Sequence, residues 1–79
     1  MNDLNKLRWR CRRGTLELDL MLTRYLECCF IEADPTEQTA FLQLLTLEDS
    51  ELMHYLMGEQ LTQDVALQGL INRIRALPA

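Results

Sequence analysis

The sequence predicts an all-α fold, a small compact bundle of about five short helices. Apolar residues recur every three or four positions along most of the chain, and no segment shows the apolar–polar alternation of a strand. Only three glycines and two prolines interrupt the 79 residues. A chain of this length suits one helical domain with a modest core, which we assign to residues 1–79.

The first helix is predicted to end at Gly14, where a flexible backbone allows the chain to turn. Leu4, Leu7 and Cys11 follow the i, i+3, i+7 spacing of a narrow apolar stripe. Trp9 lies about 200° from Leu7 around such a helix. The tryptophan is therefore expected to be exposed.

The second helix is predicted to run from about Thr15 to Glu32. Its core-facing stripe consists of Leu18, Met21, Leu22, Tyr25, Leu26 and Cys29. Four further apolar residues widen this stripe, namely Leu16, Leu20, Phe30 and Ile31. We therefore expect this helix to be central and covered on more than one side.

Capping signals separate the third and fourth helices. Asp34 and Pro35 are typical of a helix start, and Glu37 is expected to bond back to the amide of the cap residue. Asp49 is predicted to cap a short fourth helix, which Gly58 ends. The predicted inner face of the third helix consists of Phe41, Leu44 and Leu45, and that of the fourth consists of Leu52, Met53 and Leu56.

The fifth helix is predicted to begin at Thr62 or Asp64 and to be closed by Pro78. Its apolar stripe consists of Leu67, Leu70, Ile71 and Ile74. Arg73 and Arg75 stand near its C-terminus, where positive charge complements the helix dipole.

The charge distribution is strongly asymmetric, although the net charge is only −4. Residues 1–24 hold six of the eight basic residues against three acids, whereas residues 25–64 hold nine acids and no lysine or arginine. A nucleic-acid-binding domain usually spreads positive charge over a whole face. The acidic body therefore argues against a nucleic-acid partner.

The remaining composition favours a cytoplasmic protein without a metal. No apolar run approaches the roughly 20 residues that span a membrane, and no signal peptide is recognisable. The three cysteines, Cys11, Cys28 and Cys29, lack framework spacing, and the adjacent pair is expected to stay unbridged in a reducing compartment. His54 is the single histidine, so neither a zinc site nor a catalytic pair is expected.

The segment RWRCRRGTLELD, residues 8–19, has two readings. It can be a plain turn in which Gly14 or Thr15 caps the second helix, and Glu17 reaches back to the cap amide if Gly14 is the cap. A turn does not explain the clustered arginines beside Trp9, since tryptophan and arginine are enriched at binding hot spots. We expect Arg13 and Glu17 to be exposed here for a protein partner with an acidic feature.

RRGTLELD resembles the R-G-x-x-E signature of the SdhE family of small FAD assembly factors. The resemblance extends to the lead-in KLRWRCRRG, the segment DPTEQTAFLQLL and the segment LEDSELMHYLM. The family's signature falls on Arg13, Gly14 and Glu17. The resemblance further implies partner-binding roles for its flanking positions, Arg8, Trp9, Arg12 and Asp19, and for Asp49 at the fourth helix.

The resemblance implies a helper that binds the flavoprotein subunit of succinate dehydrogenase or fumarate reductase and promotes its covalent attachment of FAD. It implies no catalytic residue in this chain, because the flavoprotein performs the chemistry. We expect the protein to be a monomer. We also expect it to hold no FAD stably, since a glycine-rich dinucleotide fingerprint is absent. The alternative is a regulatory adaptor or antitoxin-like protein that uses the same surface on another client.

Overall fold

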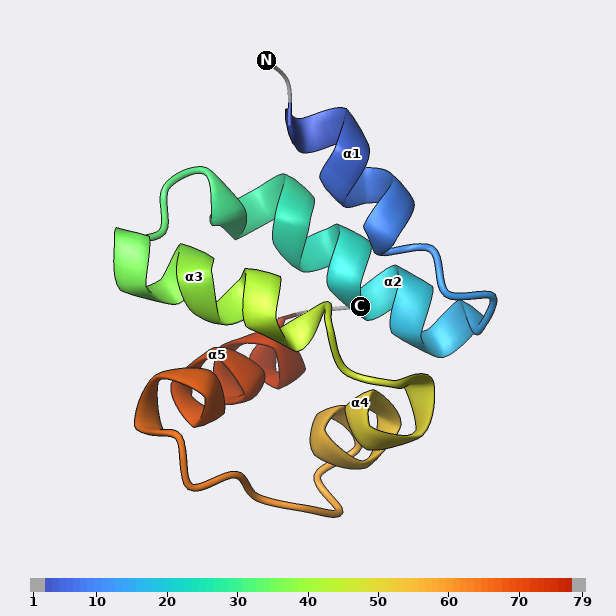
Figure 1. The fold of residues 1–79 in the computed structure, drawn as a ribbon, viewed down its shortest axis with the longest axis vertical. Helices are drawn as coiled ribbons and strands as arrows, with labels where there is room; N and C mark the ends of the chain where they lie inside the picture. The colour runs from blue at the N-terminus through green and yellow to red at the C-terminus, as the bar shows by residue number, and fades with distance from the viewer. Residues whose placement is uncertain (1–2, 78–79) are drawn as a thin grey trace.

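Five α-helices and one π-helical turn make up the regular structure of residues 3–77, the part of the chain that the computed structural model describes (Figure 1). The α-helices are α1 (Asp3–Arg10), α2 (Leu16–Tyr25), α3 (Pro35–Leu44), α4 (Asp49–Leu56) and α5 (Val65–Ala76), and η1 (Leu26–Phe30) continues α2. No strand occurs within these residues, so the predicted all-α class is confirmed. Pro78, expected to close the last helix, lies outside the described residues.

Helix α5 is the central contact element of the bundle, because it packs along α3 and also contacts α2 and α4. Figure 1 shows α1 at one end of the long axis and the loop of residues 57–64 at the other. The Cα radius of gyration is 11.5 Å, close to the roughly 12 Å expected for a compact chain of this length. The basic N-terminal segment therefore forms one end of the molecule.

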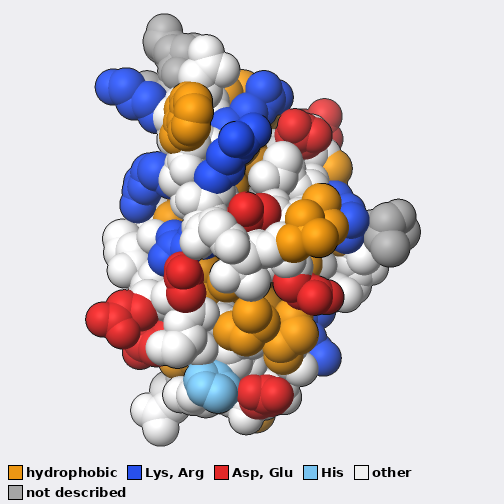
Figure 2. Space-filling model, turned by 90° about the vertical axis from the view of Figure 1, so that its right-hand side faces the viewer, with side chains coloured by type: hydrophobic (Ala, Val, Ile, Leu, Met, Phe, Trp, Pro, Cys, Tyr) orange, Lys and Arg blue, Asp and Glu red, His pale blue; other side chains and the backbone are white. Residues whose placement is uncertain are grey.

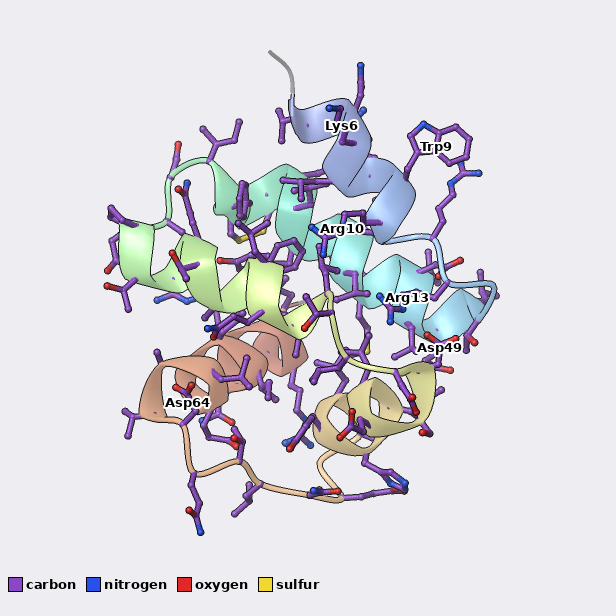
Figure 3. The ribbon with its side chains drawn as sticks, viewed as in Figure 1. Lys6, Trp9, Arg10, Arg13, Asp49 and Asp64 are labelled. Carbon is purple, nitrogen blue, oxygen red and sulfur yellow. A yellow bond between two sulfur atoms is a disulfide. The ribbon has the colours of Figure 1, made fainter. Side chains whose placement is uncertain are left out.

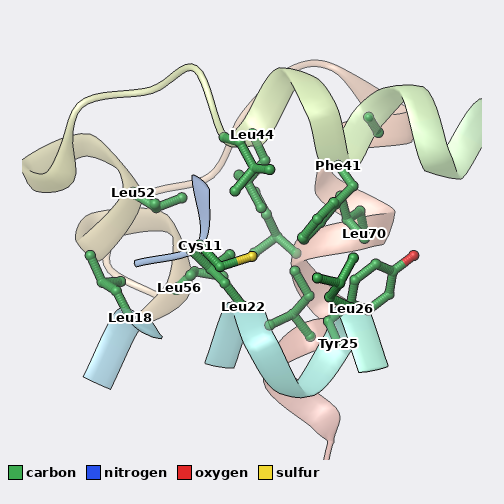
Figure 4. Close-up of a cluster of buried hydrophobic side chains, with 14 of the residues drawn as sticks. Cys11, Leu18, Leu22, Tyr25, Leu26, Phe41, Leu44, Leu52, Leu56 and Leu70 are labelled. Atoms are coloured by element: carbon green, nitrogen blue, oxygen red, sulfur yellow. The ribbon is translucent and has the colours of Figure 1, made fainter. Parts of the chain in front are cut away.

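The core is built from the predicted apolar stripes of α2, α3, α4 and α5 (Figure 4). Its fully buried members include Cys11, Leu18, Leu22, Tyr25, Phe41, Leu44, Leu52, Leu56, Leu70 and Ile71. The rings of Tyr25 and Phe30 pack against Phe41, with centroid separations of 4.9 and 5.4 Å. Hydrophobic burial of these side chains is the main stabilising contribution to the fold.

One prediction for α2 was wrong: the helix is not covered on more than one side. Leu16 and Leu20 are 74% and 50% exposed, and Ile31 beyond η1 is exposed as well. Leu16 and Leu20 each stand two residues from the buried Leu18, which is roughly half a turn around the helix. They therefore point away from the core that Leu18 enters.

Two of the predicted helix caps are confirmed. A side-chain oxygen of Asp34 accepts a hydrogen bond from the Glu37 backbone N–H at 2.8 Å, and Asp64 accepts one from Leu67 N–H at 3.1 Å. Gly58 follows α4 with a φ of +80°, the left-handed conformation typical of a helix stop. These caps fix the starts of α3 and α5.

Glu37 does not return a bond to its cap amide, contrary to the sequence prediction. Its carboxylate instead accepts a hydrogen bond from the Tyr25 hydroxyl and lies 3.4 Å from Arg73 Nε. Burial of Tyr25, together with the hydrogen bond to Glu37, raises the pKa of the tyrosine far above its ordinary value. Glu37 thus links α2, α3 and α5 at the edge of the core.

The cysteines differ from expectation at one place. Cys28 and Cys29 form a disulfide, so the prediction that they stay unbridged was wrong. That prediction assumed the 100° step of a regular α-helix, but residues 26–30 form a π-helical turn. Cys11 is free and fully buried, and its burial raises the pKa of its thiol from 9.0 to about 11.

Candidate functional site

The loop between α1 and α2 carries the R-G-x-x-E residues and turns sharply at Gly14. Gly14 has a backbone φ of +84°, a conformation that residues with a Cβ atom adopt only at an energetic cost. Thr15 is the N-cap residue of α2, without a side-chain cap bond, so the alternative with Gly14 as the cap is not observed. Glu17 consequently occupies the second helical position rather than the third.

Asp19 provides the return contact that was considered for Glu17. Its Oδ1 accepts a hydrogen bond of 2.7 Å from the backbone N–H of Arg13. Since Asp19 lies in the first turn of α2, its carboxylate also sits where the helix dipole favours negative charge. The contact holds the loop against the helix start.

Arg13 is largely buried, at 14% side-chain exposure, so the expectation that it is exposed was wrong. Its Nη1 donates to the Leu45 carbonyl at 2.9 Å, and its Nη2 donates to the Leu47 carbonyl. Its Nε donates to Asp49 Oδ1 at 2.7 Å (Figure 3). The guanidinium thus satisfies carbonyls that follow the end of α3 and joins them to the start of α4.

Asp49 has a different local role from the predicted one. It is the first residue of α4, and Glu48 before it is the N-cap residue, without a side-chain cap bond. The Asp49 carboxylate pairs with Arg13 instead of capping the helix. One hydrogen-bonded network therefore joins three residues predicted to bind a partner, Arg13, Asp19 and the half-exposed Asp49.

Trp9, Arg12 and Glu17 remain on the outside. The Trp9 side chain is 71% exposed, as predicted, and the Arg12 guanidinium lies over its ring at 5.4 Å from the centroid. Glu17 is exposed, and no hydrogen bond or ion pair joins its carboxylate to a side chain of residues 4–77. The loop therefore presents an aromatic ring with a cation, and an uncommitted carboxylate.

Arg8 belongs to another flank of α1. Its Nε lies 3.7 Å from Glu27 Oε2 in η1, and both side chains are about half exposed. Helix α1 ends at Arg10, so Arg12 does not continue the helical face that Arg8 occupies. Arg8 and Arg12, to which the resemblance gave partner-binding roles, thus do not share a helical face.

Two exposed neighbours of Glu17 were not among the predicted site residues. Leu16 and Leu20 of α2 are exposed large apolar residues one turn apart. A helical projection centred on Leu18 would have placed both on the outer side. They add apolar area to the surface formed by Trp9, Arg12 and Glu17. We call the surface formed by Trp9, Arg12, Gly14 and Glu17 the loop surface.

The charge asymmetry of the sequence is visible on the folded molecule. Figure 2 shows blue side chains gathered toward the α1 end and red side chains farther along the molecule. Within residues 3–77, no three metal-ligating side chains lie close enough to hold a metal ion. None of the helices described here combines the length and hydrophobicity that a membrane span requires.

Comparisons with known proteins match nearly the whole chain. A family model described as flavinator of succinate dehydrogenase matches residues 5–78. The FAD assembly factor SdhE of Xylella fastidiosa (strain Temecula1) is 48% identical over 77 residues, covering 98% of this chain and 79% of that protein. The FAD assembly factor SdhE of Methylococcus capsulatus is 42% identical over 77 residues, covering 98% of this chain and 93% of that protein. That of Haemophilus ducreyi is 38% identical over 78 residues, covering 96% of this chain and 95% of that protein.

Proposed function

Because the chain belongs to the family of succinate dehydrogenase flavinators, which are assembly factors and not enzymes, we propose that it binds the flavoprotein subunit of that dehydrogenase. By binding, it promotes the covalent attachment of FAD to the subunit. The flavoprotein subunit of fumarate reductase is a second client in this proposal. The protein acts as a monomer in the cytoplasm.

The exposed loop surface is the observation that carries this proposal. Trp9 and Arg12 offer a large rigid side chain beside a positive charge, a combination enriched at protein interfaces. Glu17 stands free for a basic or amide group of the client. Arg13, Asp19 and Asp49 contribute by holding the loop in one conformation, which lowers the entropy lost on docking.

The proposed mechanism is conformational, and the FAD belongs to the client. The Arg13 guanidinium is not available to a flavin pyrophosphate, because it donates to Leu45, Leu47 and Asp49. A single exposed Arg12 does not amount to a dinucleotide site. The protein therefore holds the flavoprotein in an arrangement competent for flavinylation, while the attacking residue belongs to the flavoprotein.

Deleting the protein in its host tests this proposal. Covalent flavin on the succinate dehydrogenase flavoprotein is measured by in-gel fluorescence, with the amount of flavoprotein measured on the same gel. We expect the fluorescence per flavoprotein to fall in the deletion strain and to return when the wild-type chain is supplied. Unchanged fluorescence would refute the proposal and favour the adaptor on another client.

A further inference from the structure

A concave surface lies between α1, η1 and α3. It encloses about 460 Å³, a volume within the range of binding sites for side chains and small ligands. Its lining consists of Lys6, Leu7, Arg10, Phe30, Gln38 and Leu42. We call it the α1–α3 groove.

The floor of the groove is apolar and held in place. Leu7 belongs to the buried core, and Phe30 packs against Phe41. Gln38 Nε2 donates to the Phe30 carbonyl at 2.7 Å, which ties the end of η1 to α3. Leu42 is 38% exposed and leaves apolar surface uncovered in the groove. An apolar side chain would gain burial by entering it.

The rim of the groove carries positive charge without an internal partner. Lys6 and Arg10 stand one turn apart on α1, on the same side of the helix (Figure 3). Among the side chains of residues 4–77, no ion pair or hydrogen bond joins Lys6 or Arg10 to a carboxylate, whereas Arg8, Arg13 and Arg73 are each paired. Two like charges at this spacing repel one another. Carboxylates of a partner would relieve this repulsion by pairing with Lys6 and Arg10.

We propose that the α1–α3 groove receives a segment of the client flavoprotein subunit that presents an apolar side chain flanked by two carboxylates. The apolar side chain contacts Phe30 and Leu42, and the carboxylates pair with Lys6 and Arg10. This inference rests on the proposed function, because it names a second contact of the same client. Trp9 of the loop surface and both cations of the groove belong to the same helix, α1.

Photo-cross-linking tests which segment enters the groove. A photoreactive phenylalanine replaces Leu42 in the full chain, which is mixed with purified flavoprotein subunit, and the cross-linked peptide is identified by mass spectrometry. We expect a flavoprotein peptide with at least two Asp or Glu residues around an apolar one. A peptide without carboxylates, or a cross-link to a second copy of this chain, would overturn the inference.

Charge exchange at the rim tests the role of the cations. In calorimetric titration against the flavoprotein, the double variant Lys6→Glu/Arg10→Glu should raise the Kd roughly tenfold or more, and less so at high salt. The matched control Lys6→Arg/Arg10→Lys keeps both charges and should bind like the wild type. Both residues are exposed, and circular dichroism checks that each variant stays folded.

The two failures are distinguishable in the same experiment. If the wild-type chain does not bind the flavoprotein, the proposed function fails and the groove inference falls with it. If the wild type binds and the Lys6→Glu/Arg10→Glu variant binds equally well, only the groove inference is refuted.

Discussion

Replacing Arg13 with alanine should destabilise the fold severely, although Arg13 belongs to the motif expected to bind a partner. The substitution removes the donor of three hydrogen bonds that connect the α1–α2 loop to the end of α3 and the start of α4. It leaves the Leu45 and Leu47 carbonyls without this partner and separates Asp49 from its counter-charge. All three acceptors lie more than 30 residues away in the sequence, so a tertiary junction is lost.

The magnitude follows from the exposure of the partners. A hydrogen bond from a charged donor contributes about 1.5–3 kcal/mol when buried, and the two carbonyl bonds are partly buried. The Asp49 side chain is 51% exposed, so its ion pair adds at most about 1 kcal/mol after screening by water. Losses within one network overlap, which gives a total of about 3 kcal/mol. For a domain of this size, that lowers the Tm by roughly 15 °C.

Urea denaturation followed by circular dichroism measures the effect, with Arg12→Ala as the matched control. The Arg12 guanidinium only stacks on exposed Trp9, so its removal should change the free energy of unfolding by less than about 1 kcal/mol. Arg13→Lys should fall between the two, because one ammonium cannot reproduce the planar three-way contact. Equal stabilities for Arg13→Ala and Arg12→Ala would refute the structural role assigned to Arg13.

Three further predictions follow from the loop and the core. Glu17→Gln should weaken flavoprotein binding roughly tenfold with an unchanged Tm. The control Glu51→Gln replaces an exposed carboxylate in the first turn of α4 and should alter neither binding nor Tm. Equal binding of the two variants would return Glu17 to a structural role. Gly14→Ala should lower the free energy of unfolding by about 1 kcal/mol through backbone strain alone, because nothing lies within 4 Å of the added Cβ, and Gly14→Asn should lose less; a gain in stability on thermal denaturation would contradict the left-handed turn. The raised pKa of Cys11 means that the folded state favours the neutral thiol. The contribution of this thiol to the free energy of unfolding is therefore complete below pH 9 and is lost as the pH rises toward 11. The stability gap between wild type and Cys11→Ala should therefore narrow over that interval in urea titrations, and a gap independent of pH would show that the thiol is not shielded.

The helices could be predicted because their signals are local. Asp34 and Asp64 cap helices through amides three residues away, and the apolar stripe containing Leu18 and Leu22 repeats within a few turns. Such patterns depend on the helical repeat and not on the rest of the fold. They predicted the all-α class and most of the buried residues, and they also indicated that Trp9 lies outside.

The role of Arg13 could not be predicted, because two of its partners are backbone carbonyls. Every residue presents the same backbone carbonyl, so the side chains of Leu45 and Leu47 carry no signal of this contact. The π-helical turn that contains Cys28 and Cys29 has no local sequence signal either. Leu16 and Leu20 were different: they were predicted to widen the core stripe, although a helical projection would have placed them opposite Leu18.

The separation of charge along the molecule gives it an electric dipole. In the sequence, residues 1–24 carry a net charge of +3, from six bases and three acids, and residues 25–64 carry −9. In the electric field of an acidic surface, the molecule turns its α1 end forward before any contact forms. A larger fraction of diffusional encounters then begins with Trp9 and the α1–α3 groove facing the client, and added salt should slow association more than it speeds dissociation.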